Sequence, residues 1–102
     1  MIKHIVMFRL KDAQGRTALE NALEAKKRAD RLPALVPSLR GFEAVVNSEA
    51  ADPSNFHIAL ICTFDDMKGL EEYQVHPDHK AFGAFVAEIR AENGRACIDY
   101  EV

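Results

Sequence analysis

The nine residues from Phe56 to Phe64 place the strongest constraint on what this chain can fold into. They are apolar at almost every position and include several residue types that favour strands. Because successive side chains of a strand point to opposite faces of its sheet, this segment is apolar on both faces. A sheet with one face in water normally alternates apolar and polar residues. The predicted strand therefore needs cover on both sides.

The remaining segments predict helices that cover one of those sides. The expected elements, in chain order, are a strand Ile2–Leu10, a helix Asp12–Leu35, strands Gly41–Ser48 and Phe56–Phe64, a helix Met67–Val75 that continues after Pro77 as far as Asn93-Gly94, and a strand Arg95–Val102. This β-α-β-β-α-β order predicts an α+β, ferredoxin-like fold with an antiparallel sheet. The length of 102 residues predicts one domain, residues 1–102.

The ends of the helices are expected from their residue types. Thr17 opens a capping box with Glu20, although Asp12 could cap an earlier start. Pro33 and Pro37 are expected to end the first helix, and Asn93-Gly94 the last one. These helices leave the second face of the sheet uncovered, and a second copy of the chain, packed sheet to sheet, would cover it. We therefore expect a homodimer that forms an alpha/beta barrel.

Composition excludes several other classes of protein. The net charge is -3 and no run of like charges interrupts it, which argues against a nucleic-acid or anionic-membrane partner. No segment approaches the roughly 18 apolar residues of a membrane span, and no leader pattern is visible at the N-terminus. A cytoplasmic protein is the resulting expectation. Cys62 and Cys97 form no metal or redox motif, so both are expected to be reduced thiols on strands.

The stretch from Tyr73 to His79 is the best candidate site, and its shape is set by Pro77. Proline cannot continue a helix but suits the first position of a new one, so the segment reads as a helix end, a corner and a helix start. A corner turns Tyr73 and His79 toward a common space. A histidine near a helix N-terminus is favoured in its neutral form, which a general base requires. Tyr73 could then stabilise a developing oxyanion.

The same residues also have simpler interpretations. Tyr73 could pack against the corner, and His76 and His79 could satisfy backbone groups there. His4, on the more apolar face of the first strand, could be hydrogen-bonded within the barrel. His76, Asp78 and His79 do not have a standard zinc spacing, and we predict neither a metal nor another cofactor. No glycine-rich phosphate loop and no nucleophile beside a base are visible.

Two segments resemble the stress-responsive dimeric alpha/beta barrel (Dabb) family. His4-Ile5-Val6-Met7-Phe8-Arg9-Leu10-Lys11 is similar to its opening strand, and Phe64-Asp65-Asp66 with Tyr73-Gln74-Val75-His76-Pro77-Asp78-His79 is similar to its central signature. The resemblance extends over essentially the whole chain and implies a homodimer. Polyketide cyclases with this signature work without a cofactor. By that resemblance Tyr73 and His79 are candidate catalytic residues, His4 and His76 candidate substrate-binding residues, and Asp99-Tyr100 matches a pair in the last strand. His57 falls one residue out of register and is interpreted as structural or surface.

The sequence therefore predicts a homodimer that binds, or transforms by cofactor-independent acid/base chemistry, a small carbonyl-containing organic molecule. The alternative is a non-catalytic, stress-related protein whose histidines are structural. A cavity that opens onto His79 favours the first prediction, and a filled barrel favours the second. The sequence names no substrate.

Overall fold

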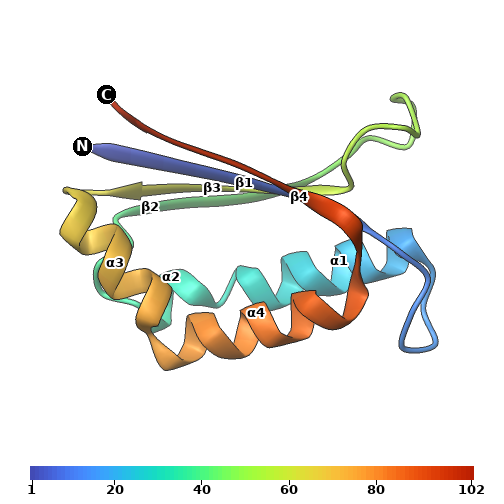
Figure 1. Cartoon of the computed structure of the whole chain (residues 1–102), viewed down its shortest axis with the longest axis horizontal. Coiled ribbons are helices and arrows are strands. Elements are labelled where there is room, and N and C mark those ends of the chain that lie inside the picture. The colour runs from blue at the N-terminus through green and yellow to red at the C-terminus, as the bar shows by residue number, and fades with distance from the viewer.

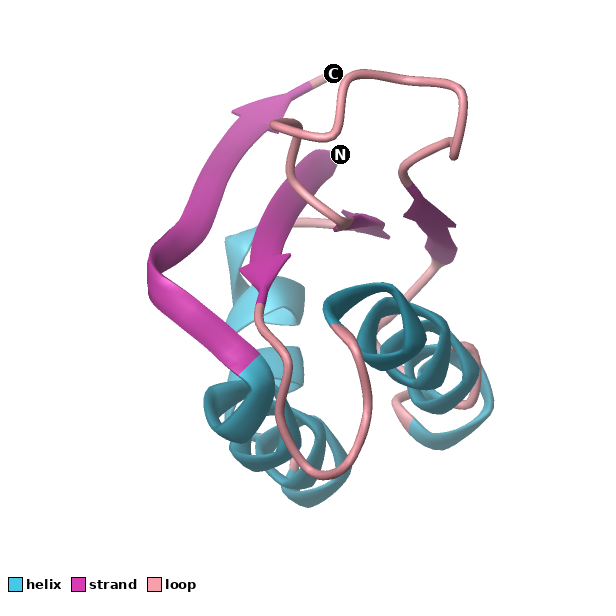
Figure 2. Ribbon diagram, turned by 90° about the vertical axis from the view of Figure 1, so that its right-hand side faces the viewer, coloured by secondary structure: helices cyan, strands magenta, loops and turns pink.

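The computed structural model describes residues 1–102 and has the predicted order of elements (Figure 1). In chain order these are β1 (Ile2–Leu10), α1 (Ala18–Ala29), α2 (Leu32–Leu35), β2 (Gly41–Val46), β3 (Ile58–Phe64), α3 (Met67–Val75), α4 (Pro77–Ile89) and β4 (Arg90–Glu101). All neighbouring strands are antiparallel, in the order β2-β3-β1-β4. The helices all lie on one side of this sheet (Figure 2). This is the ferredoxin-like fold that the sequence predicts.

The core lies between the sheet and the helices. Strand register places Ile2, His4 and Val6 of β1 on the helix-facing side, opposite Phe64, Cys62 and Leu60 of β3. Helix α1 contributes Ala22, Ala25 and Ala29, whose small side chains let the helix lie close to the sheet. Helix α4 contributes Phe82, Phe85, Val86 and Ile89. None of the helices has the length and apolar character needed to cross a membrane.

The first helix begins later and ends earlier than predicted. Residues 12–16 form a turn instead, in which Gln14 and Gly15 have positive φ angles of 56° and 73°. Thr17 then caps α1 with the predicted capping box, because its side chain accepts from the Glu20 N–H and the Glu20 side chain accepts from the Thr17 N–H. Asp12 assists by accepting from the Ala18 N–H. Pro33 does not end a long helix but lies in the first turn of the separate α2.

The prediction that Asn93-Gly94 ends the last helix is wrong. Helix α4 ends at Ile89, and Arg90, with extended backbone, already pairs with Leu10 as part of β4. The positive φ of 56° at Asn93 serves a register shift within the β1–β4 ladder rather than a helix C-cap. Both uses need the same left-handed backbone, and for this reason the dipeptide was assigned to the wrong element.

The other face of the sheet has no helix over it, and we call it the outer face. It carries Ile5 and Met7 of β1, Ile61 of β3, and Ile98 and Tyr100 of β4. Ile98 is 59% exposed and Tyr100 39% exposed. The strand Ile58–Phe64 is therefore buried on its helix-facing side and only half-buried on its outer side, as its two-sided apolar sequence requires.

Candidate functional site

The Pro77 corner has the predicted geometry. Asp66 caps α3 by accepting from the Gly69 N–H, and α3 ends at Val75. His76 has extended backbone, with φ -64° and ψ 137°, and stands between the two helices as the C-cap of α3 and the N-cap of α4. Pro77 is the first residue of α4, where its missing N–H leaves no gap in the helical hydrogen bonds. The change of direction at His76 brings the last turn of α3 toward the first turn of α4.

Tyr73 and His79 meet across this corner. Their ring centroids are 4.2 Å apart, with the ring planes tilted by 48°. Tyr73 is almost fully buried and also packs on Phe64 of β3, at 5.2 Å between ring centroids. His79 is half-buried. The pair thus combines one ring held rigidly by the core with one that keeps contact with open space.

Electrostatics give the two groups complementary roles. Burial, followed by the effect of the neighbouring Cys62 thiol, raises the pKa of Tyr73 well above its usual range, so the phenol stays protonated and can donate a hydrogen bond. Burial also lowers the pKa of His79, with smaller contributions from His4 and His76, opposed by the contact with the Gln74 carbonyl. The imidazole is therefore neutral near pH 7. The lowering is in the direction expected from the sequence, but desolvation is its largest cause.

The hydrogen bond of His79 also fixes its tautomer. His79 Nδ1 lies 3.3 Å from the Gln74 carbonyl oxygen, which can only accept. The ring proton therefore belongs on Nδ1, and Nε2 keeps a free lone pair. A neutral imidazole with a free Nε2 next to a protonated phenol is the arrangement of a base and a hydrogen-bond donor.

The Tyr73–His79 pair lies on the wall of a cavity of about 260 Å³, which we call the inner cavity. It is lined by residues of β1, β3, α3, α4 and the first half of β4, and it is partly open to solvent. Its lining residues are His4, Val6, Phe8, Leu60, Tyr73, Gln74, His79, Phe82, Gly83, Val86, Ala87, Arg90 and Arg95. An apolar lining with a few polar groups is typical of small-molecule sites, and the volume is just below their usual range of roughly 300–1,000 Å³.

The only charged side chains that line the inner cavity directly are two arginines. Its lining contains no aspartate or glutamate, but it does contain Arg90 and Arg95. Neither arginine forms an ion pair with a carboxylate of the protein. Two unpaired guanidinium groups beside an apolar space favour a ligand that carries an anionic group.

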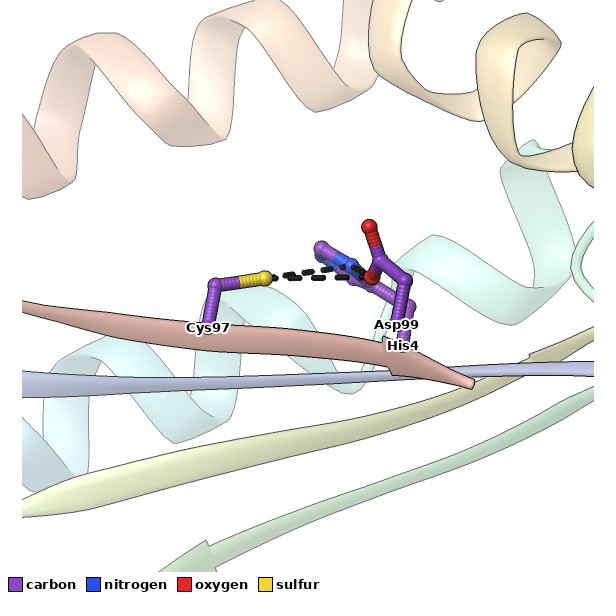
Figure 3. Close-up of polar contacts among 3 residues, drawn as sticks. All are labelled: His4, Cys97 and Asp99. Carbon is purple, nitrogen blue, oxygen red and sulfur yellow. Dashed lines mark hydrogen bonds and ion pairs between the residues drawn. The ribbon is translucent and has the colours of Figure 1, made fainter. Parts of the chain in front are cut away.

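The opposite wall of the cavity is built from β1 and β4. His4 pairs with Asp99 in the strand register, and its Nδ1 is hydrogen-bonded to the Asp99 carboxylate (Figure 3). Cys97, two residues earlier on the same face of β4, places its Sγ 3.4 Å from the same nitrogen. His4 is only 3% exposed, and its Nε2 has no hydrogen-bond partner in the protein. Because Nε2 is not one of the fully buried polar atoms without a partner, it must be accessible. The accessible Nε2 of His4 therefore reaches the inner cavity, and its tautomer is set by Asp99.

The other two histidines lie outside the inner cavity. His76, an expected substrate-binding residue, is not part of its lining, because its Nδ1 accepts the Asp78 N–H at 3.1 Å and caps α4. This contact gives His76 a structural position at the corner. His57 accepts the Leu10 N–H at 2.9 Å through its Nδ1.

Sequence reasoning did not find Arg90, Arg95 or Cys97 as parts of the site. Arg90 lies in the segment that was assigned wrongly to the last helix. Arg95 was correctly expected on the last strand, but nothing in the sequence pointed it toward the site, and Cys97 is 93 residues away from His4. Pairing the first strand with the last one would have been the available signal. In that pairing, residues at alternate positions of β4 face the same side as His4.

Comparison with known proteins identifies the family of the chain. The sequence model of the stress responsive A/B barrel domain matches residues 2–102. The chain belongs to this family. No curated protein matches the chain. The resemblance that the two segments carry is thus confirmed at the level of the family.

Several solved structures share the fold. A dimeric ferredoxin-like protein of unknown function from Bacteroides fragilis is 34% identical, with a TM-score of 0.79 over 99% of this chain and 95% of that one. A dimeric protein from Thermobifida fusca is 27% identical, with a TM-score of 0.81 over 99% and 90%. A third dimer, from Jannaschia, is 31% identical, with a TM-score of 0.74 over 99% and 98%. All three are described as dimers of unknown function, so they support the fold and an assembly but no particular chemistry.

Proposed function

We propose that this A/B barrel protein is a homodimer whose subunits each bind a small, carbonyl-containing organic acid in the inner cavity. We further propose that Tyr73 and His79 perform cofactor-independent acid/base chemistry on it. The observation that carries the proposal is the pairing of a neutral His79 with a protonated Tyr73 at 4.2 Å, on the wall of a cavity. A filled space at this place would have favoured a structural role for both rings.

The lining residues support the ligand class. Phe8, Leu60 and Phe82 offer apolar contact to a ring or a short chain. Arg90 and Arg95 offer charge-assisted hydrogen bonds to a carboxylate. A ligand that satisfies both regions has an apolar body and an acidic group, and the cavity volume of about 260 Å³ limits it to a small molecule.

The chemistry that fits these groups is proton abstraction beside a carbonyl. His79 Nε2 takes the proton from the carbon next to the carbonyl, and the electron pair of the broken C–H bond moves toward the carbonyl oxygen. The Tyr73 hydroxyl donates a hydrogen bond to the enolate that forms. The same imidazolium then returns its proton to carbon, or the enolate attacks a second carbonyl in the same molecule and the new alkoxide takes the proton. Each route restores neutral His79.

The dimer rests on the outer face. Its exposed apolar residues include Met7 on β1, Val45 on β2, and Ile98 and Tyr100 on β4, so they extend from one edge of the sheet to the other. An uncovered apolar sheet is unusual on a monomer. The dimeric structural neighbours support a second copy as the cover.

The alternative, a non-catalytic protein with structural histidines, also has one contact in its favour. His79 Nδ1 bonds to the Gln74 carbonyl and so links the two helices of the corner. Under this alternative the ring is there to hold α3 against α4. The two functions predict opposite patterns for the same substitutions.

Those patterns give the test. Under the acid/base proposal, His79→Ala costs clearly less than the roughly 1–3 kcal/mol lost with a buried, satisfied polar group, because the ring faces a cavity. It also abolishes the rise in melting temperature that small aromatic and polyketide-like acids produce in the wild type. Tyr73→Phe keeps the buried ring and weakens the same response more mildly. Urea unfolding and a thermal-shift screen measure both effects. A loss above about 2 kcal/mol for His79→Ala, with no ligand response in the wild type, would establish the structural alternative.

A further inference from the structure

Three different metal-binding side chains converge beside the inner cavity, and one of them, His4, lines it. His4 Nδ1, Cys97 Sγ and an oxygen of Asp99 all lie within 4.8 Å of one another. Cys97 and Asp99 stand at alternate positions of β4, so both side chains rise from the same face of the strand toward the His4 ring (Figure 3). We call these three residues the β4 cluster, and we propose that it binds a divalent transition-metal ion of the zinc type.

The distances suit such an ion. In a tetrahedral zinc site the metal lies about 2.3 Å from sulfur and about 2.0–2.1 Å from nitrogen, which separates the two donors by roughly 3.6 Å. Cys97 Sγ is 3.4 Å from His4 Nδ1 and 3.8 Å from the Asp99 oxygen. The His4–Asp99 pair is closer, at hydrogen-bonding distance, and opens by a rotation of the Asp99 side chain. That side chain is 37% exposed, so solvent leaves room for the rotation.

The donor set selects the metal. One imidazole, one thiolate and one carboxylate form a mixed nitrogen, sulfur and oxygen site, which suits Zn²⁺ or Co²⁺ and does not suit the oxygen-seeking Mg²⁺ or Ca²⁺. Two anionic donors balance the charge of a divalent ion. Three protein ligands leave a fourth position for water, as in zinc sites that stay open to a ligand.

The surroundings bear on the affinity in two ways. His4 is held by the core, so one ligand is positioned before the metal arrives. Burial, followed by the charge of Asp99, raises the pKa of Cys97, and Arg95 at the next alternate position of β4 opposes this only in part, so the thiol loses its proton when the metal binds. The charge of Arg95 also repels the metal. We expect a moderate affinity rather than that of a closed structural zinc site.

Metal binding would also change what His4 presents to the inner cavity, a consequence that rests on the proposed function. In the metal-free protein Asp99 accepts the Nδ1 proton, and Nε2 is an acceptor. A metal on Nδ1 moves the ring proton to Nε2, which then becomes a donor. The metal would thus switch His4 from accepting to donating a hydrogen bond toward the ligand.

A spectroscopic titration tests the site without any organic ligand. Reduced, metal-free wild-type protein is titrated with Co²⁺, and Zn²⁺ is then added to displace it. The expected result is one Co²⁺ per chain with a thiolate-to-cobalt charge-transfer band that Zn²⁺ removes. Cys97→Ser abolishes the band, and Asp99→Asn weakens binding by about tenfold or more. Both positions are exposed, so the variants are expected to keep the fold, which circular dichroism checks.

The matched control is His76→Asn. Asparagine can keep the helix cap that His76 provides, and the substitution removes an imidazole that lies away from the β4 cluster. It should leave the titration unchanged. Loss of binding in His76→Asn but not in Cys97→Ser, or the absence of a charge-transfer band in the wild type, would overturn the proposal. Either outcome leaves the acid/base proposal intact, because that test uses organic acids and no metal.

Discussion

The two faces of the sheet have opposite characters although the same four strands build them. On the helix-facing side, β4 places Cys97 and Asp99 against the buried His4. On the outer face, the residues between and after them are Ile98 and Tyr100, which are apolar and partly exposed. One strand thus carries the polar groups of a candidate site on one side and part of a candidate dimer interface on the other. Because alternation alone separates the two roles, strand register decides both.

The most disruptive change to this division should be a charge on the outer face. Ile61 is half-buried on the central strand β3, where a second copy would cover it completely. Ile61→Lys would bury an unpaired ammonium in that interface, which costs several kcal/mol or more, by the usual scale for a desolvated charge. We expect the variant to be a folded monomer at micromolar concentration. Light scattering measures the mass.

Leu23→Lys is the matched control, because Leu23 is 55% exposed on α1, away from the sheet. It also replaces an aliphatic side chain by lysine, and it should leave the dimer intact. A dimeric Ile61→Lys protein would show that the outer face is not the interface.

A second prediction concerns the register that keeps the two faces apart. A Cβ at Gly94 would lie 2.5 Å from the Arg9 carbonyl oxygen and 2.7 Å from that of Ala91, both of them backbone atoms. Gly94→Ala must therefore displace β4 from β1, and we expect a loss of roughly 1–3 kcal/mol, the usual cost of overpacking. Urea unfolding measures it. Because the displacement affects both faces, dimer mass and Co²⁺ binding should decline together.

Gly83→Ala is the control for this glycine. A Cβ at Gly83 has no atom within 4 Å, and alanine favours a helix over glycine by up to about 1 kcal/mol. The variant should be as stable as the wild type or more stable. If Gly94→Ala were equally harmless, the close approach of the strands would not fix the register.

The helix-facing side also shows which parts of a site can be predicted from a sequence. The corner from Tyr73 to His79 was predicted because its geometry is local, since Pro77 dictates where one helix ends and the next begins. His76 satisfied the same sequence pattern, but the direction of its ring toward the Asp78 N–H depends on a single rotamer. Which of two nearby histidines faces a cavity is not encoded in their spacing.

The β4 cluster shows the opposite case. Its residues are 93 and 95 positions apart from His4, and they meet only because β1 and β4 pair in one particular register. A shift by one residue would have turned Ile98 toward His4 instead. The left-handed Asn93, assigned from sequence to a helix end, lies at the irregularity of this ladder. The order of the strands along the chain could be predicted. The register of β4 against β1, which places Cys97 and Asp99 beside His4, could not.

The smallest expected effect is the part of the pH dependence of stability that His79 contributes from the wall of the inner cavity. Burial lowers the pKa of His79 from its ordinary value of 6.5, so the folded protein takes up this proton less readily than the unfolded chain. Stability is then unaffected by His79 at higher pH and falls as the pH drops below about 6.5, because the unfolded state binds the proton first. His57, whose pKa is also lowered by burial and by Arg9, contributes in the same direction and remains in the variant.

His79→Gln keeps a neutral side chain of similar size and removes this titration. Urea unfolding at pH 8 measures the difference in the free energy of unfolding that packing alone causes, because His79 is neutral there. The same measurement at about pH 5 also includes the free energy of protonating His79, because histidine changes charge between these pH values. The variant should lose less stability than the wild type on acidification. Parallel pH profiles would mean that His79 is as well solvated in the folded protein as in the unfolded one, and the inner cavity would then hold no pre-formed neutral base. A smaller loss in the variant would show that the sheet's helix-facing side disfavours positive charge at the place where the proposed proton transfer begins.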